Sequence, residues 1–169
     1  MTNIEEIAKR IAETTNVHEQ PFSQQETHAP HVVHACLAQL RNVRYDTLEQ
    51  FYALMTTLAD GYRLVGNTTK ARYYINHKLT ASAPHTVTHT EALLQRAAID
   101  EHAGCYDEAY AMLMKAQRHI AQYGHMQYET ALLTQLVRCS LLLQRYDDAD
   151  CYVRALRNET NAITHAHVS

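Results

Sequence analysis

Histidines are the residues of this sequence whose spacing could do chemistry. The stretch HAPHVVH places His28, His31 and His34 three residues apart, and PHTVTH places His85 and His89 four apart. A spacing of four puts two imidazoles on one face of a helix, which suits a metal ion. Neither group has a convincing third ligand, because His28 precedes Pro30 in an expected loop and Glu91 lies only two residues past His89. The sequence therefore favours histidines at the surface and at helix caps, and predicts no metal site.

Signatures of enzymes are missing from the sequence. It contains no nucleophile motif, no glycine-rich phosphate loop and no HExxH helix. Paired carboxylates do occur, as Asp107 with Glu108 and as Asp147 with Asp148, but at positions where we expect helices to begin. Carboxylates there cap free amides and complement the helix macrodipole. We expect no catalytic residues, no enzyme activity and no cofactor.

A short motif recurs along the chain and defines the elements that must position these residues. Its first copy, GNTTKARYYI, is the weakest and begins at Gly66. The second, GCYDEAYAML, begins at Gly104, and the third, QRYDDADCYV, begins at Gln144. The first alanines shared by these motifs, Ala71, Ala109 and Ala149, stand 38 and then 40 residues apart. A period of this size is typical of stacked helical units.

Other residues keep fixed distances from each of these anchor alanines. They form columns twelve positions before, sixteen before and four after the anchor, which is the spacing of one buried helical stripe. The columns are Ala59, Ala97 and Val137; Met55, Leu93 and Leu133; and Ile75, Leu113 and Val153. Each unit is therefore predicted to be a pair of helices, with turns near residues 66, 104 and 144.

These units resemble tetratricopeptide repeats (TPR), whose helical hairpins carry a small residue, a Gly-x-Tyr turn and a following alanine. The resemblance covers roughly Thr47 to Asn158, with a period of 38 to 40 residues, longer than the usual 34. It implies an all-α fold in which TPR-like antiparallel hairpins stack as a short right-handed solenoid. About three repeats would follow two N-terminal helices.

The apolar pattern divides the chain into three parts. Residues 1–46 hold two helices and a polar connection, residues 47–158 the three hairpins, and residues 159–169 a tail without an apolar stripe, expected to be disordered. The isoleucine-lined first helix could cap the array, insert into its concave face or join two copies as a homodimer. Within the hairpins we expect helices over about 48–65, 68–79, 87–102, 106–122, 127–143 and 146–157.

Charge and composition restrict the partners and the compartment. The net charge is −3 and the basic residues are scattered, which argues against nucleic acid. No apolar run approaches the length of a membrane span, and the start of the chain reads as an amphipathic helix rather than a signal peptide. The four cysteines show no paired metal spacing and are expected to be reduced. We therefore expect a cytoplasmic protein without a membrane segment.

The TPR resemblance also implies a binding groove, lined by the first helix of each unit. Its lining mixes small and apolar residues with both signs of charge, which suits a peptide or a protein helix. Apolar contact is expected at its centre, with the arginines orienting the partner; the alternative is a solvated surface that binds nothing. The groove positions are Thr56, Asp60, Arg63, Glu91, Leu94, Ala98, Glu101, Thr134, Arg138 and Leu141.

The leading hypothesis is a non-enzymatic module that binds a protein or peptide. It would serve as an adaptor, as a chaperone, or as a peptide-sensing regulator that lacks its DNA-binding part. The stretch DTLEQFYAL and the overall size resemble the small TPR chaperones of bacterial secretion systems. The alternative from another class is a histidine-dependent metal-binding protein or enzyme.

The anchor alanines provide a first test. We expect Ala109→Leu and Ala149→Leu each to lower the free energy of unfolding by about 1–3 kcal/mol, because the alanine sets how closely the two helices approach. Urea denaturation followed by circular dichroism measures the change. Midpoints equal to that of the parent would show that the repeat register is wrong.

Overall fold

The computed structural model describes residues 38 and 47–166, with side chains described at residues 38 and 47–158. The predictions for residues 1–37 and 39–46, including both N-terminal helices, lie outside these residues. The described part is helical between its turns and contains no strand, so the all-α prediction is confirmed there. By its contacts the chain separates into two compact units, residues 1–83 and 84–169.

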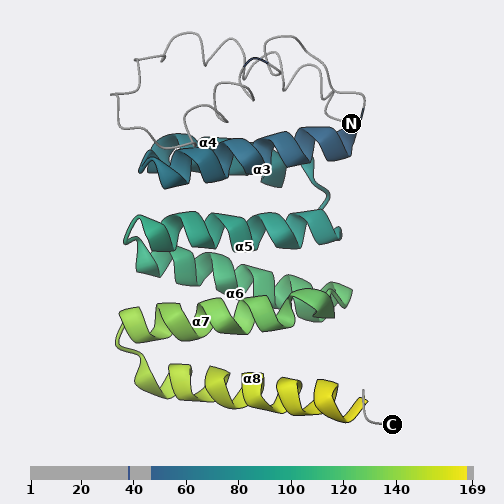
Figure 1. The fold of residues 1–169 in the computed structure, drawn as a ribbon, viewed down its shortest axis with the longest axis vertical. Helices are drawn as coiled ribbons and strands as arrows, with labels where there is room; N and C mark the ends of the chain where they lie inside the picture. Colours follow the sequence, from purple (N-terminus) through teal and green to yellow (C-terminus); the bar gives the residue numbers. More distant parts are fainter. Residues whose placement is uncertain (1–37, 39–46, 167–169) are drawn as a thin grey trace. The chain divides into compact units, whose positions relative to one another are not determined.

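The first unit contains one pair of helices, α3 (Leu48–Leu64) and α4 (Thr68–Ala81), which pack against each other (Figure 1). Both helices begin at a side-chain cap: the oxygens of Thr47 and Asn67 accept hydrogen bonds from the amides of Gln50 and Lys70. Each such cap contributes about 1 kcal/mol. The core between the helices is apolar and aromatic, and the rings of Tyr62 and Tyr74 stack with centroids 5.5 Å apart.

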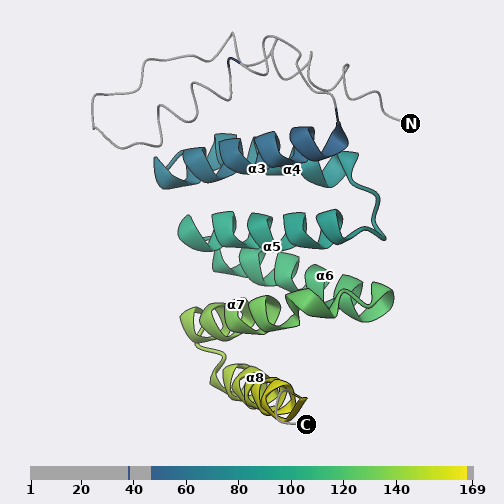
Figure 2. The same ribbon diagram turned by 45° about the vertical axis from the view of Figure 1, so that its right-hand side comes forward.

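The second unit contains four helices and one turn of 3₁₀ helix. These are α5 (Val87–His102), α6 (Tyr106–Tyr123), η1 (Met126–Tyr128), α7 (Glu129–Leu142) and α8 (Tyr146–Ala166). Helix α5 packs on α6, α6 on α7, and α7 on α8, so that consecutive helices lie side by side (Figures 1 and 2). The predicted helices therefore exist, with most ends within about two residues of the prediction.

Three turns of the chain share one hydrogen-bond pattern. In each, a residue in the left-handed conformation follows the helix: Gly66 and Gly104 at φ 77° and Gln144 at φ 59°. At the second turn, the amide of Gly104 donates to Glu101 and that of Cys105 donates to Asp100, at 3.0 and 2.9 Å. The same two bonds recur at the other two turns. This is the Schellman motif, and the turns predicted near 66, 104 and 144 are confirmed.

Most residues of the columns are buried as predicted, but Val137 on α7 is partly exposed and Val153 on α8 is exposed. Leu113 on α6 is fully buried, whereas Val153, forty positions later on α8, is 39% exposed. Helix α7 packs on α6, but α8 is the last helix that the structure describes, so no described helix follows to cover its side chains.

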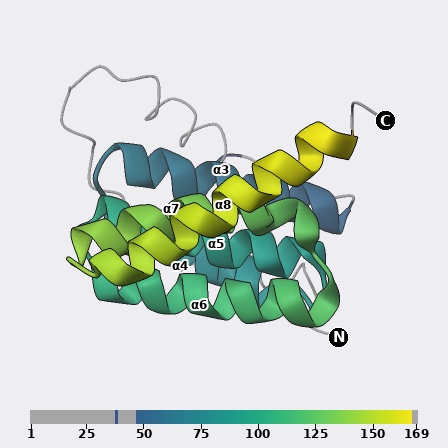
Figure 3. The same ribbon diagram turned by 90° about the horizontal axis from the view of Figure 1, so that it is seen from below.

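Two sequence predictions for helix ends are wrong. Helix α8 was expected to end near Arg157, but it continues to Ala166 and so enters the segment assigned to a tail (Figure 3). The segment after the turn at Gln144 contains no glycine or proline, so nothing local stops α8 once it has begun. Carboxylates were also expected to cap α6. Its N-cap residue is Cys105, without a side-chain cap bond, and Asp107 lies inside the first turn.

Replacing Gln144 by glycine should stabilise the protein. An L-residue in the left-handed conformation costs roughly 1–2 kcal/mol, so we expect Gln144→Gly to raise the free energy of unfolding by up to about 1 kcal/mol. Gly104→Ala should lower it by a similar amount, although a β-carbon there would meet nothing within 4 Å. Urea denaturation of both variants measures the two changes. Gln144→Ala, which keeps the β-carbon, is the control and should show no gain.

Candidate functional site

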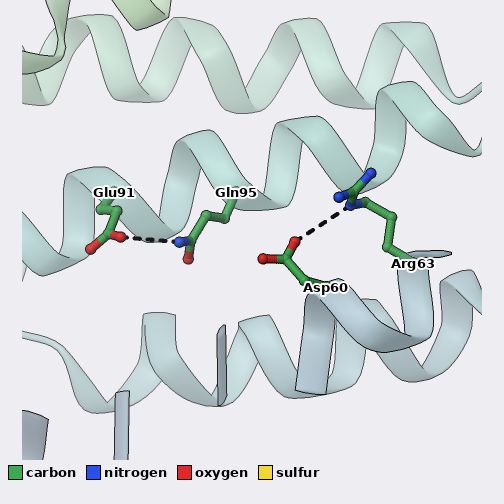
Figure 4. Close-up of polar contacts among 4 residues, drawn as sticks. All are labelled: Asp60, Arg63, Glu91 and Gln95. Carbon is green, nitrogen blue, oxygen red and sulfur yellow. Dashed lines mark hydrogen bonds and ion pairs between the residues drawn. The ribbon is translucent and has the colours of Figure 1, made fainter. Parts of the chain in front are cut away.

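The predicted groove residues of the first unit bond to neighbours in that unit. The Thr56 hydroxyl accepts a hydrogen bond of 2.8 Å from the ammonium of Lys78, a buried residue of α4. Asp60 and Arg63 form an ion pair of 3.4 Å within α3 (Figure 4). Because both ends of this pair are partly exposed, it stabilises the fold little and its charges largely cancel for an approaching partner.

In the second unit, α5 supplies four of the predicted residues. Glu91 accepts a hydrogen bond of 3.1 Å from the Gln95 amide one turn along the same helix (Figure 4). Ala98 and Glu101 are partly exposed. Leu94 is only 5% exposed and belongs to the core. Because it is buried, Leu94 packs in the core and is not available to contact a partner.

Helix α7 supplies the other three residues, all exposed. Thr134 donates its hydroxyl proton to the carbonyl of Thr130 at 2.7 Å, which leaves a small and locally neutral side chain at the surface. Leu141 is 50% exposed. Arg138 reaches across to α5, where its Nε and Nη2 lie 3.1 and 3.2 Å from the two carboxylate oxygens of Glu101.

The pair formed by Arg138 and Glu101 brings the predicted residues of α5 and α7 onto one surface. One hydrogen bond, from Nη2 to Oε2, and the ion pair of Nε with Oε1 hold the two side chains together, and a hydrogen bond between charged groups is among the stronger ones. Glu101 is 17% exposed and Arg138 54%, so the pair is partly screened by solvent. We refer to this surface as the α5–α7 strip and define it by its exposed and partly exposed members: Glu91, Ala98, Glu101, Thr134, Arg138 and Leu141.

A buried thiol lies behind the ion pair. Cys139 is fully buried, and its Sγ lies 3.8 Å from Glu101 Oε2. Burial raises the pKa of the Cys139 thiol to about 11, and the charge of Glu101 and its hydrogen bond with the thiol add to the shift, while Arg138 opposes it. Sequence reasoning did not single out this residue, because no spacing rule relates positions on two different repeats.

Both arginines of the predicted groove are paired with carboxylates of the protein. Arg63, predicted to orient a partner, pairs with Asp60 within α3, and Arg138, predicted to do the same, pairs with Glu101 of α5. An arginine that is already paired offers little net attraction to an anion. The strip thus presents small and apolar side chains, the neutralised pair of Arg138 and Glu101, and the carboxylate of Glu91, which accepts a hydrogen bond from Gln95. No nucleophile or general base stands on it in a geometry that suggests catalysis.

The structure describes only some of the candidate histidines. Those at positions 28, 31 and 34 lie outside the described residues. His89 stacks on His119 of α6 with ring centroids 5.1 Å apart, and His119 donates its Nδ1 proton to the Pro84 carbonyl at 3.0 Å. His125 Nδ1 lies 2.8 Å from the hydroxyl of buried Thr90. Among the described residues, no three His, Cys, Asp or Glu side chains converge as ligands of a metal ion.

Comparison with known proteins identifies no relative. No protein-family model matches the chain, and no curated protein and no solved structure is similar to it. Of the helices described over residues 47–166, none combines the length and the apolar character that crossing a membrane requires. The function must therefore be argued from the geometry of the chain itself.

The raised pKa of Cys139 predicts its reactivity. At pH 8 this thiol should stay protonated and should not react with iodoacetamide in the folded protein, whereas exposed Cys151 should react readily. Mass spectrometry of peptides from the alkylated protein measures both sites. Unfolding in urea before alkylation is the control and should label both equally. Labelling of Cys139 at the rate of Cys151 would contradict the burial described above.

Proposed function

We propose that this protein is a non-enzymatic module of TPR-like hairpins that binds a peptide or a helix of a protein partner through the α5–α7 strip. The observation that carries the proposal is the contact between Arg138 and Glu101. It joins the first helices of two successive hairpins, α5 and α7, and thereby builds one continuous surface from them.

The equivalence of the turns supports the TPR-like part of the proposal. The amides of Ala71, Ala109 and Ala149 each donate a hydrogen bond of 3.0 Å to the carbonyl of the residue at the start of the helix, Asn67, Cys105 and Arg145 respectively. All three anchor alanines are buried. One local geometry at three places, in the register of the sequence motif, is what a repeat protein requires.

The character of the strip supports a protein partner over a small charged ligand. Its arginine is neutralised within the unit, and its other members are small or apolar at the centre and at one end. A surface of this kind binds by shape and apolar contact, with charge affecting orientation more than affinity. The α5–α7 strip is open rather than enclosed, whereas small-molecule sites bury most of their ligand.

Two alternatives remain from the sequence. A small TPR chaperone of the secretion type would use the same strip, and so differs only in the identity of the partner. A histidine-dependent metal protein would use the stacked pair of His89 and His119 instead. A third ligand would then have to come from side chains that do not converge with these two in the described structure.

The strip can be tested with peptides selected for binding. A random peptide library displayed on phage is selected against the protein, and the affinity of the recovered peptides is measured by fluorescence anisotropy. Ala131→Arg places a bulky charge on the exposed face of α7, about one turn before Thr134 at the end of the strip. We expect it to lower the affinity about tenfold or more, because a partner that covers the strip would bury an unpaired charge.

A matched control lies on α6. Ala111 is also exposed, and Ala111→Arg adds the same side chain away from the strip. We expect this variant to bind as the parent does. Equal affinities of the two variants, or recovery of no binding peptide, would refute the proposed function.

A further inference from the structure

The turn between α7 and α8 exposes three large apolar side chains within six positions. Leu141 is 50% exposed, Leu142 47% and Tyr146 64%. The turn does not require leucines, since Glu101 and His102 hold the equivalent positions at the Gly104 turn, which has the same hydrogen bonds. Exposed apolar side chains that the fold does not need often mark a contact with another protein.

The charges around this turn are unbalanced toward the negative. Arg138 is bound to Glu101, and Arg145 Nη2 lies 3.9 Å from Asp107. Asp147 and Asp148 are exposed and form no ion pair with any of the residues whose side chains are described. Both carboxylates border an open depression that is lined by residues 144–148.

We propose that this turn is the anchor point for a cationic amphipathic segment of a protein partner. The inference rests on the proposed function, because the α5–α7 strip ends at Leu141. Apolar side chains of the segment cover Leu141, Leu142 and Tyr146, while its lysine or arginine side chains lie beside Asp147 and Asp148. An acidic segment, a phosphate group or an anionic membrane is repelled by the same carboxylates.

The two leucines distinguish this turn from its equivalent, whereas the carboxylates and Tyr146 have counterparts there, Tyr106 being the counterpart of Tyr146. Asp107 and Glu108 stand at the start of α6 as Asp147 and Asp148 stand at the start of α8, and both pairs complement a helix dipole. Apolar contact therefore provides most of the affinity, and the carboxylates steer the segment and fix its direction.

The experiment uses the whole chain and a synthetic amphipathic peptide of leucine and lysine with helical spacing, labelled for fluorescence anisotropy. Leu142→Gln removes apolar contact at the turn and should weaken binding about tenfold. Asp148→Asn should weaken it a few-fold at low salt and have little effect at high salt, because exposed charges are screened. A leucine and glutamate peptide of the same spacing should not bind.

Glu108→Gln is the matched control, since it removes a carboxylate at the equivalent position of the other turn, and it should leave the affinity unchanged. Equal losses for Glu108→Gln and Asp148→Asn would mean non-specific attraction and would overturn the proposal. So would a Leu142→Gln variant that binds as the parent does. Sedimentation that shows self-association lost in Leu142→Gln would assign the turn to a second copy of this chain instead. If Ala131→Arg abolishes binding of selected peptides while Leu142→Gln does not, the strip is the site and this anchor is wrong.

Discussion

The left-handed residue that closes each turn is the constraint on which the rest of this structure depends. A backbone with positive φ at Gly66, Gly104 and Gln144 lets two amides return to the last carbonyls of the preceding helix, and it sends the chain back along that helix. The next helix then starts at a fixed distance, with the anchor alanine as its fourth residue. Because the direction of return is fixed, the buried columns of the paired helices face each other.

The repeat of this geometry brings residues that are distant in sequence onto one surface. Successive first helices present equivalent faces, so that side chains 37 positions apart in sequence, Glu101 and Arg138, meet across α5 and α7. The surface is assembled from positions that no local motif connects. This surface consists of small residues, exposed leucines at one end, and an arginine that is paired with a carboxylate of the protein. This is why we propose a protein partner rather than a substrate.

The histidines were the residues whose spacing suggested a metal site, and tertiary packing gives those that are described other partners. His89 and His85 were considered as a pair on one helical face, but His85 precedes α5 in a turn, and His89 stacks on His119 of the next helix. His119 is held by a backbone carbonyl and His125 by a buried threonine hydroxyl. Imidazoles that bond to the backbone and to hydroxyls stabilise the ends of helices, and such bonds form only after the helices have packed.

The sequence alone determined the helices, the turns and most of the core. The apolar periodicity, the glycines and the small anchor residues act on neighbours close in sequence, so their effects can be predicted without the fold. Met55, Leu93 and Leu133, for example, were predicted to be buried, and they are. Only the tertiary structure decided which predicted groove residues are available. It buries Leu94, pairs Arg138 with Glu101, and places Cys139 behind that pair. These outcomes depend on how closely α5 and α7 approach, and on the carboxylate that an arginine meets there. Distances between residues about 40 positions apart follow from packing, not from the pattern of either helix.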